Sequence, residues 1–246
     1  MTADPEKLAG RRAFVTGGGR GIGAAIVLEL LRRGASVVYA DIALEAAEPS
    51  ISNSSAAGIA LDVSDPAAVA RTVATHGPFD ILVNNAGRDQ HAFFTDTTPQ
   101  DWSDLLAVNL ISVLACTHAA LPAMQRSGYG RIINIASEAG RIGSKGGSVY
   151  AAAKGGVIAF TKSIARENAR YGVTANVVAP GPIRTPLLER AVEAGGPQLL
   201  AAMEQATLMR RLGEPAEVAA LVGHLATDAA GYITAQTIGV SGGMAC

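Results

Sequence analysis

Tyr150 and Lys154 lie four residues apart in the alanine-rich segment SVYAAAKGG, residues 148–156. Residues at this spacing lie side by side on one face of a helix. A phenol has a pKa of roughly 10, and a nearby ammonium group favours its phenolate, so the pair could serve as a general base. A core tyrosine beside a surface lysine would have the same spacing. The segment alone favours that simpler interpretation.

The glycine-rich sequence TGGGRGIG, residues 16–23, is a second candidate for chemistry. Glycines let the backbone turn tightly and approach a pyrophosphate at a helix N-terminus. The spacing is GxxxGxG, from Gly17, Gly21 and Gly23, rather than the GxGxxG of the common dinucleotide fingerprint. Asp41 ends the next apolar segment, where a carboxylate can accept hydrogen bonds from an adenosine ribose. Together these features predict a dinucleotide site.

Seven short apolar segments alternate with segments of helical period. They are RAFVTGG, SVVYAD, GIALDV, DILVNNAG, RIINIAS, VTANVVAP and TIGVSGG. Continuous apolar strands separated by helices imply parallel pairing, with both faces of the sheet covered. The pattern predicts an α/β fold with one domain over residues 1–246, a Rossmann-like doubly wound parallel sheet of about seven strands flanked by helices. Ligands of such sheets bind beyond the carboxyl ends of the strands.

Composition narrows the range of partners. The 246 residues carry a formal net charge of −1, with acidic and basic side chains interspersed along the chain. Because no basic face is available, we expect neither nucleic acid nor a membrane as a partner. The start MTADPEKLAG is unlike a signal or transit peptide and predicts a cytoplasmic protein. Cys116, Cys246 and the four histidines show no metal-binding spacing, so no metal site is expected.

The uncharged stretch LLAVNLISVLACTHAALPAM, which starts at Leu105, is long enough to be considered as a membrane span. Polar residues interrupt it, so a buried helix of a soluble protein explains it better. The preceding TPQD, residues 98–101, is typical of a helix N-terminus. Asn109 falls on the apolar face of this helix and must find hydrogen-bond partners there. The helix of the SVYAAAK segment should end at Gly172.

Eight features occur in the order that is typical of one enzyme family. They are TGGGRGIG, LDVSD, NNAG, Asn109, Ser137 in NIASEAG, YAAAK, APGPIRT and the terminal GVSGG. By these features the chain resembles the short-chain dehydrogenase/reductase family over nearly its whole length. The resemblance implies an NAD(P)-dependent enzyme that acts on CH–OH donors.

The resemblance also implies roles for individual residues. The glycine turn would surround the cofactor phosphates, Asp41 would bind the adenosine ribose, Asp62 and Val63 would flank the adenine, and the APGPIRT segment would border the nicotinamide. The residues expected to bind the cofactor are Gly17, Arg20, Gly21, Ile22, Gly23, Asp41, Asp62, Val63, Asn85, Ala86, Gly87, Tyr150, Lys154, Pro180, Gly181, Ile183 and Thr185.

The catalytic residues implied by the resemblance are Asn109, Ser137, Tyr150 and Lys154. Tyr150 would take the alcohol proton during oxidation or give it during carbonyl reduction, and Ser137 would hydrogen-bond the reacting oxygen. Lys154 would stabilise the phenolate and hold the nicotinamide ribose. Asn109 would order a water between Lys154 and solvent. The core-tyrosine interpretation then fails, because all these partners are present.

The main functional expectation is an NAD-dependent oxidoreductase that interconverts a secondary alcohol and a ketone. Asp41 favours NAD because its carboxylate would repel the 2′-phosphate of NADP, although Arg20 could meet that phosphate. The first alternative is an NADPH-dependent 3-oxoacyl thioester (acyl carrier protein) reductase. A catalytically idle dinucleotide-binding regulatory protein ranks low, because the expected catalytic residues are all retained.

The expected substrate is bulky, cyclic or aryl, with a hydroxyacyl thioester as one form. RDQHAFF (88–94) and EAGRIGSKGG (138–147) should line its pocket, with residues about 182–213 as a lid. Apolar area would come from Phe93, Phe94, Leu187, Leu188 and Met203. An anionic tail could meet Arg88, Arg141 or Lys145, although a solvated loop charge is the simpler interpretation of each. By resemblance we expect a homotetramer that pairs the Asp101–Gln125 helix and the Tyr150 helix.

Overall fold

The computed structural model describes residues 6–51 and 55–245, so residues 1–5 of the N-terminal segment and Cys246 lie outside the described residues. Within helices, the side chains of Pro49, Leu187, Arg190, Ala191 and Ala194 also lie outside that description. The expected contribution of Leu187 to the substrate pocket therefore stays a prediction.

Seven parallel strands form one sheet in the order β3-β2-β1-β4-β5-β6-β7. The strands are β1 (Arg12–Thr16), β2 (Ser36–Asp41), β3 (Ala56–Ala60), β4 (Ile81–Asn84), β5 (Gly130–Ile135), β6 (Val173–Pro180) and β7 (Thr237–Val240). Each predicted apolar segment contains or overlaps one of them, with β3 beginning two residues before GIALDV and β5 one residue before RIINIAS. The strand order reverses between β1 and β4, which makes the sheet doubly wound, and the predicted fold class is confirmed.

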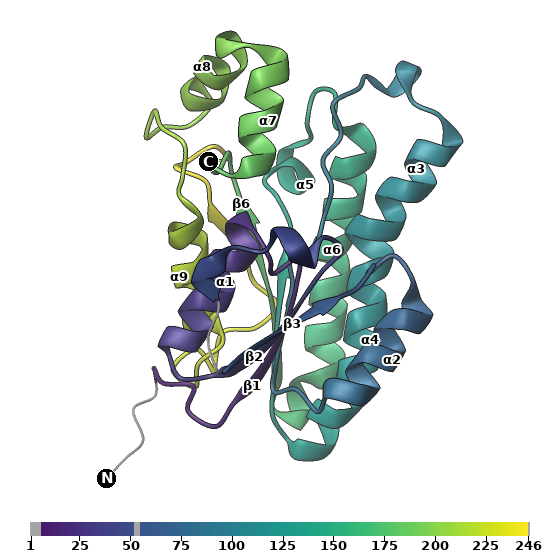
Figure 1. Ribbon diagram of the computed structural model, residues 1–246, viewed down its shortest axis with the longest axis vertical. Coiled ribbons are helices and arrows are strands. Elements are labelled where there is room, and N and C mark those ends of the chain that lie inside the picture. Colours follow the sequence, from purple (N-terminus) through teal and green to yellow (C-terminus); the bar gives the residue numbers. More distant parts are fainter. Residues whose placement is uncertain (1–5, 52–54, 246) are drawn as a thin grey trace.

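Helices cover both faces of the sheet (Figure 1). On one face lie α1 (Gly21–Arg32) and α9 (Pro215–Leu225), and on the other lie α2 (Pro66–His76), α4 (Ser112–Ser127) and α6 (Ser148–Asn168). Successive side chains of β1 enter opposite cores, since Val15 packs with α1 and α9 while Phe14 packs with α2 and α4. The apolar strand segments follow from this burial on both faces.

The apolar helix predicted after Thr98 consists of three parts. They are α3 (Pro99–Leu106), a π-helical segment η4 (Ala107–Ile111) and α4. Thr98 and Asp101 form the expected capping box. Among the described residues, Pro99–Ser127 is the one helical stretch long and apolar enough to cross a membrane. Here it packs against α2, α6 and β4 as a core helix.

Several short elements complete the upper part of the molecule in Figure 1. They include α5 (Ala139–Ile142) after β5, and α7 (Pro186–Gly195) and α8 (Pro197–Gln205) after β6. The last two lie within the segment expected to form a lid. Below them, α6 continues through η5 (Ala169–Tyr171) and stops at Gly172, whose φ of 70° is a left-handed conformation that suits glycine, as predicted.

Candidate active site

A cavity of about 650 Å³ lies at the carboxyl edge of the sheet. All the residues expected to bind the cofactor or to act in catalysis line it. They come from the turn after β1, the end of β2, the loops after β3, β4 and β5, the π-helical segment, α6, and the end of β6 with the loop that follows. Parallel strands place their carboxyl ends at one edge, which explains how segments far apart in the sequence meet here.

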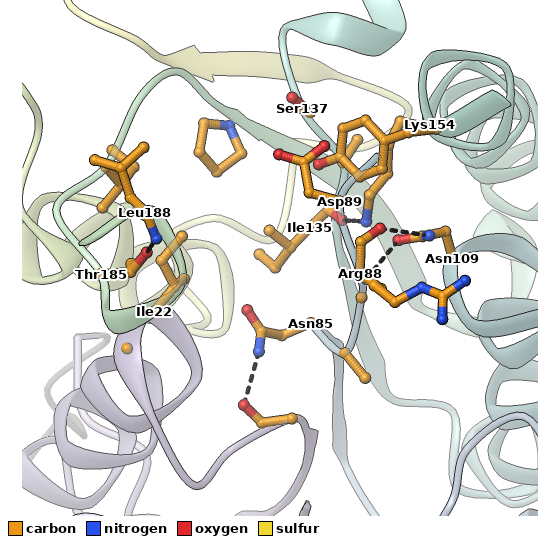
Figure 2. A pocket seen from close by; sticks show the side chains of 18 of the residues that line it. Ile22, Asn85, Arg88, Asp89, Asn109, Ile135, Ser137, Lys154, Thr185 and Leu188 are labelled. Atoms are coloured by element: carbon orange, nitrogen blue, oxygen red, sulfur yellow. Dashed lines mark hydrogen bonds between the residues drawn. The ribbon is translucent and has the colours of Figure 1, made fainter. Parts of the chain in front are cut away.

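The glycine turn packs directly against the loop after β4. Gly17 has a φ of 61°, and a Cβ there would lie 2.9 Å from Cα of Ala86. A Cβ on Gly23 would collide with the carbonyl oxygen of Gly17. Asn85 Nδ2 donates to the carbonyl oxygens of Thr16 at 3.1 Å and Gly17 at 2.9 Å, and one such bond is drawn in Figure 2. Glycine is therefore required at this turn for close packing.

Asp41 is fixed at the end of β2. Its Oδ2 accepts the backbone N–H of Gly19 at 3.0 Å, and its Oδ1 accepts that of Ala43 at 3.1 Å. The neighbouring Ile42 is 70% exposed and also lines the cavity, although the sequence interpretation did not single it out. Both hydrogen bonds hold the carboxylate in place, so it cannot easily turn away from a bound ligand.

The first N–H group of α1 already has an anionic partner. Gly21 N donates to Glu48 Oε1 at 3.0 Å, and Glu48 N donates back to Gly19 O at 2.9 Å. A carboxylate at this helix N-terminus is stabilised by the unpaired N–H groups and the helix dipole. The contact joins residues 27 positions apart and has no local motif, so the sequence offered no signal for it.

Asn109 lies in the π-helical segment and is fully buried. Its side chain holds both polar backbone groups of Arg88: Nδ2 donates to Arg88 O at 2.9 Å, and Oδ1 accepts Arg88 N–H at 3.2 Å (Figure 2). Nδ2 also donates to Leu105 O at 3.0 Å. Short π-helical insertions are frequent at functional sites, and this one directs Asn109 at the loop after β4. The expected water between Asn109 and Lys154 stays a prediction.

Ser137, Tyr150 and Lys154 meet at one end of the cavity. Ser137 follows β5 and hydrogen-bonds Tyr150, which begins the first turn of α6 together with Ser148 and Val149. The Lys154 ammonium lies 5.7 Å from the centre of the Tyr150 ring. The same ammonium donates to the carbonyl oxygen of Ile135 at 2.9 Å (Figure 2). Because Tyr150 and Lys154 are four residues apart on α6, the phenol and the ammonium both line the side of the cavity that this helix forms.

Burial dominates the ionisation of this pair. The pKa of Tyr150 is raised to about 12, mainly by burial and also by the Asp89 charge, against the opposing effect of the Ser137 hydrogen bond. Burial also lowers the pKa of Lys154 to about 8, and there the Asp89 charge opposes it. In the protein alone, the net effect of these surroundings is therefore to raise the pKa of Tyr150 rather than to lower it. The expected stabilisation of the phenolate by Lys154 stays a prediction.

The segments expected to line the substrate pocket do so only in part. Arg88, Asp89 and His91 line the cavity from the first segment, and Glu138, Ala139, Gly143 and Ser144 line it from the second. Of the apolar side chains expected from the lid segment, Leu188 and Met203 line the cavity. Phe93 and Phe94 lie outside the lining and are each 55% exposed, with Phe94 stacked on Trp102 at 5.3 Å. The two phenylalanines supply their apolar area to the surface instead.

Two of the three cations considered for an anionic tail are committed elsewhere. Arg141 pairs with the buried Glu138 at 2.9 Å, and Lys145 Nζ lies 5.8 Å from the Phe93 ring. Neither belongs to the cavity lining. Arg88 does, so it is the cation of the three that faces the cavity.

Gln90 is a functional candidate that the sequence interpretation missed. Its Oε1 accepts the backbone N–H groups of Val149 at 2.9 Å and Tyr150 at 3.2 Å, while its Nε2 donates to Ala92 O at 3.0 Å. The side chain thus caps the N-terminus of α6 from a loop 59 and 60 residues away. A contact at this separation has no signature in the local sequence.

The lining suits a nicotinamide dinucleotide. Glycines form a cradle that a Cβ would fill, a helix N-terminus stands beside it, and Asp41 offers a carboxylate at the end of β2. A family model described as enoyl-(acyl carrier protein) reductase matches residues 17–245.

Individual proteins match along nearly the whole chain. The 3-oxoacyl-(acyl-carrier-protein) reductase of Vibrio cholerae is 40% identical over 243 residues, which cover 96% of this chain and 98% of the relative. The acetoacetyl-CoA reductase of Shinella zoogloeoides is 39% identical over 95% of this chain and 98% of its own. A crystal structure from Agrobacterium tumefaciens, assigned provisionally as a gluconate dehydrogenase, superposes with a TM-score of 0.88 at 30% identity and covers 98% of each chain. The chain therefore belongs to the short-chain dehydrogenase/reductase family, and it is an oxidoreductase that acts on CH–OH donors.

Proposed function

We propose that the protein is an NAD(H)-dependent oxidoreductase that interconverts 3-hydroxyacyl and 3-oxoacyl thioesters. The thioester part rests on two relatives, named for 3-oxoacyl and acetoacetyl thioesters, at 39–40% identity. This replaces the first expectation of a bulky cyclic or aryl alcohol and favours the substrate of the first alternative. The proposal includes a cytoplasmic location.

The cluster at the end of the cavity supplies the proton chemistry. When bound, the nicotinamide gives a hydride to the ketone carbon or accepts one from the alcohol carbon. Tyr150 gives its proton to the ketone oxygen in reduction and takes the alcohol proton in oxidation. Ser137 hydrogen-bonds the same oxygen, and the Lys154 charge stabilises the phenolate that forms. The glycine turn and Asp41 hold the other end of the cofactor.

Asp41 supports NAD over NADP. A carboxylate accepts hydrogen bonds from a free ribose 2′-hydroxyl and repels a 2′-phosphate. Because Gly19 N–H and Ala43 N–H each hold one oxygen, the carboxylate cannot rotate to relieve that repulsion. In this respect the proposal differs from the NADPH-dependent alternative.

The cofactor proposal is tested by kcat/KM with NADH and NADPH. The wild type should prefer NADH, and Asp41→Asn, which keeps one acceptor oxygen, should narrow the preference by about tenfold or more, as expected when a charge repulsion is removed. Glu45→Asn, at an exposed position nearby, is the matched control. A wild-type preference for NADPH would overturn the NAD assignment.

The substrate proposal is tested by a panel with the better cofactor. Acetoacetyl-CoA and 3-oxoacyl-(acyl-carrier-protein) are compared with cyclic and aryl ketones and with short linear ketones. The proposal expects the highest kcat/KM with a thioester. Faster turnover of the cyclic or aryl ketones would restore the earlier expectation and reject the thioester.

A further inference from the structure

The loop after β4 is held rigidly on both sides of one acidic residue, Asp89. On one side, Asn109 binds both backbone polar groups of Arg88, at 2.9 and 3.2 Å. On the other side, the buried Gln90 side chain is anchored to the N-terminus of α6 and to Ala92 O. These anchors fix the backbone on both sides of Asp89, and a binding site needs its side chains to be held in place in this way.

The Asp89 carboxylate lines the cavity beside the catalytic cluster. Figure 2 shows it on the side of the cavity where Ser137 and Lys154 lie. Its charge acts on both Tyr150 and Lys154, which agrees with a position near the reacting groups. The side chain is 40% exposed and therefore within reach of a bound molecule.

One Asp89 oxygen has spare capacity as an acceptor. Oδ1 accepts Gln90 N–H at 2.8 Å. The basic side chain nearest to Oδ2 among the ion-pair contacts is His91, whose Nε2 lies 3.8 Å away, beyond hydrogen-bond distance. Among the described residues no hydrogen bond to Oδ2 is present. A bound substrate would shield this oxygen from solvent. A ketone without a donor group would then leave Oδ2 without a hydrogen-bond partner.

We propose that Asp89 is a specificity-determining residue that accepts a hydrogen bond from a hydroxyl group on the carbon next to the reacting one. Within any one class of carbonyl substrate, 3-oxoacyl thioesters included, the α-hydroxy ketones and the corresponding vicinal diols are then preferred over analogues that lack this hydroxyl. The inference rests on the proposed function for the carbonyl reaction, and it adds a hydroxyl beside the reacting carbon of the substrate. Substrates with an anionic group at that carbon are disfavoured by like charge.

The test compares two ketones that differ by this hydroxyl, 3-hydroxybutan-2-one and butan-2-one. Wild-type kcat/KM should favour the hydroxy ketone by about tenfold or more, as expected for a hydrogen bond to a charged group. Asp89→Ala should bring the ratio close to one, mainly by loss of the hydroxy ketone reaction. Asp89→Asn, which keeps the shape and an acceptor oxygen, should give an intermediate ratio.

Asp96→Ala is the matched control, because Asp96 is an exposed acid of the same connection and lies outside the cavity lining. It should keep the wild-type ratio. Thermal melting and the fluorescence of bound NADH report on folding and on cofactor binding in every variant. If Asp89→Ala does not fold, the ratio for Asp89→Asn decides.

Two results would overturn the assignment of Asp89. One is a wild type without preference for the hydroxy ketone. The other is an equal loss with both ketones in the Asp89 variants, which would place the carboxylate on the cofactor or on the catalytic pair. Failure of thioester turnover alone would reject the proposed acyl substrate and leave the measured ratio, and so this inference, intact.

Discussion

Tyr150 is the proton donor and acceptor in the proposed reaction. Asp89 raises the pKa of its phenol and Ser137 lowers it, and the Lys154 ammonium lies 5.7 Å from the centre of its ring. Tyr150→Phe removes the exchangeable proton and little volume. Turnover should fall by at least about a hundredfold, as for a lost general acid. NADH affinity, measured by fluorescence, should change little. Tyr232→Phe, at a fully exposed position, should behave as wild type. Near-normal turnover in purified Tyr150→Phe would exclude the assigned role.

Lys154 should make the folded protein less stable at neutral pH. Burial lowers its pKa from the usual 10.5 to about 8. Between these two values the unfolded chain binds more protons than the folded one, so stability rises with pH across this window. Below pH 8 the lysine is charged in both states, so the folded state bears the whole free-energy cost of burying the ammonium.

Lys154→Met should therefore raise the free energy of unfolding by about 1 to 3 kcal/mol at pH 7, after allowance for the lost hydrogen bond to Ile135 O. The gain should shrink as pH rises through the window from 8 to 10.5. Urea unfolding across that range measures it, and Lys162→Met on the exposed side of α6 is the control. Turnover should fall sharply. A variant less stable than wild type at pH 7 would contradict the assigned cost of burial.

At the scale of elements, α6 depends on a cap from another part of the chain. Gln90→Ala would leave the Val149 and Tyr150 N–H groups without their acceptor. The free energy of unfolding should fall by about 1 to 3 kcal/mol. Because Tyr150 itself loses an anchor, kcat should fall more than the KM for NADH rises. Thermal melting and steady-state kinetics measure the two effects.

Gln90→Glu is the rescue variant, because it keeps an acceptor and places a negative charge at a helix N-terminus. It should recover most of the lost kcat. Gln100→Ala is the matched control, since the Gln100 side chain is exposed and donates to Asp104 at the surface. If Gln90→Glu has a kcat as low as that of Gln90→Ala, the Gln90 amide acts through its hydrogen bond to Ala92 O rather than through its cap on α6.

The elements that the sequence predicted are those with a local signal. Apolar runs located all the strands, and the Thr98 cap and the Gly172 stop depend on residues within one turn. The π-helical segment and the Gln90 cap arise from tertiary packing, which leaves no pattern nearby. The pair of Arg141 with Glu138 has a helical spacing, but it was missed because α5 was taken for a loop.

For the whole molecule, the candidate site was predictable because the motifs fall at strand ends. Once the sheet is parallel, residues after β1, β4, β5 and β6 must meet at one edge, and the cavity there contains all of the expected residues. Asp89 was expected only as part of the RDQHAFF segment and Ile42 was not singled out, because each is an ordinary loop residue whose importance depends on what faces it. The sequence therefore predicted the residues of the shared reaction, and it did not identify the residues that distinguish one substrate from another.

The outer face of the long helical stretch points to assembly. Pro99–Ser127 has a mean hydropathy of 1.8 in its most apolar window, yet only 39% of that window is buried within the chain. Ile111 is 42% exposed in the middle of it. On α6, Ala152 and Ala159 are exposed small residues that permit close approach of another helix. An apolar surface of this kind is typical of an interface between subunits.

The family resemblance implies a homotetramer, and we expect these two helices to pair between its subunits. Light scattering at micromolar concentration should give about four times the 25.0 kDa of one chain. Ile111→Asp buries a charge at the interface and should shift the mass toward smaller species, because an unpaired buried charge costs several kcal/mol. Ala74→Asp, on the exposed side of α2, adds the same charge and should leave the mass unchanged. A wild-type monomer would reject the tetramer, whereas an Ile111→Asp tetramer would move the interface away from this helix.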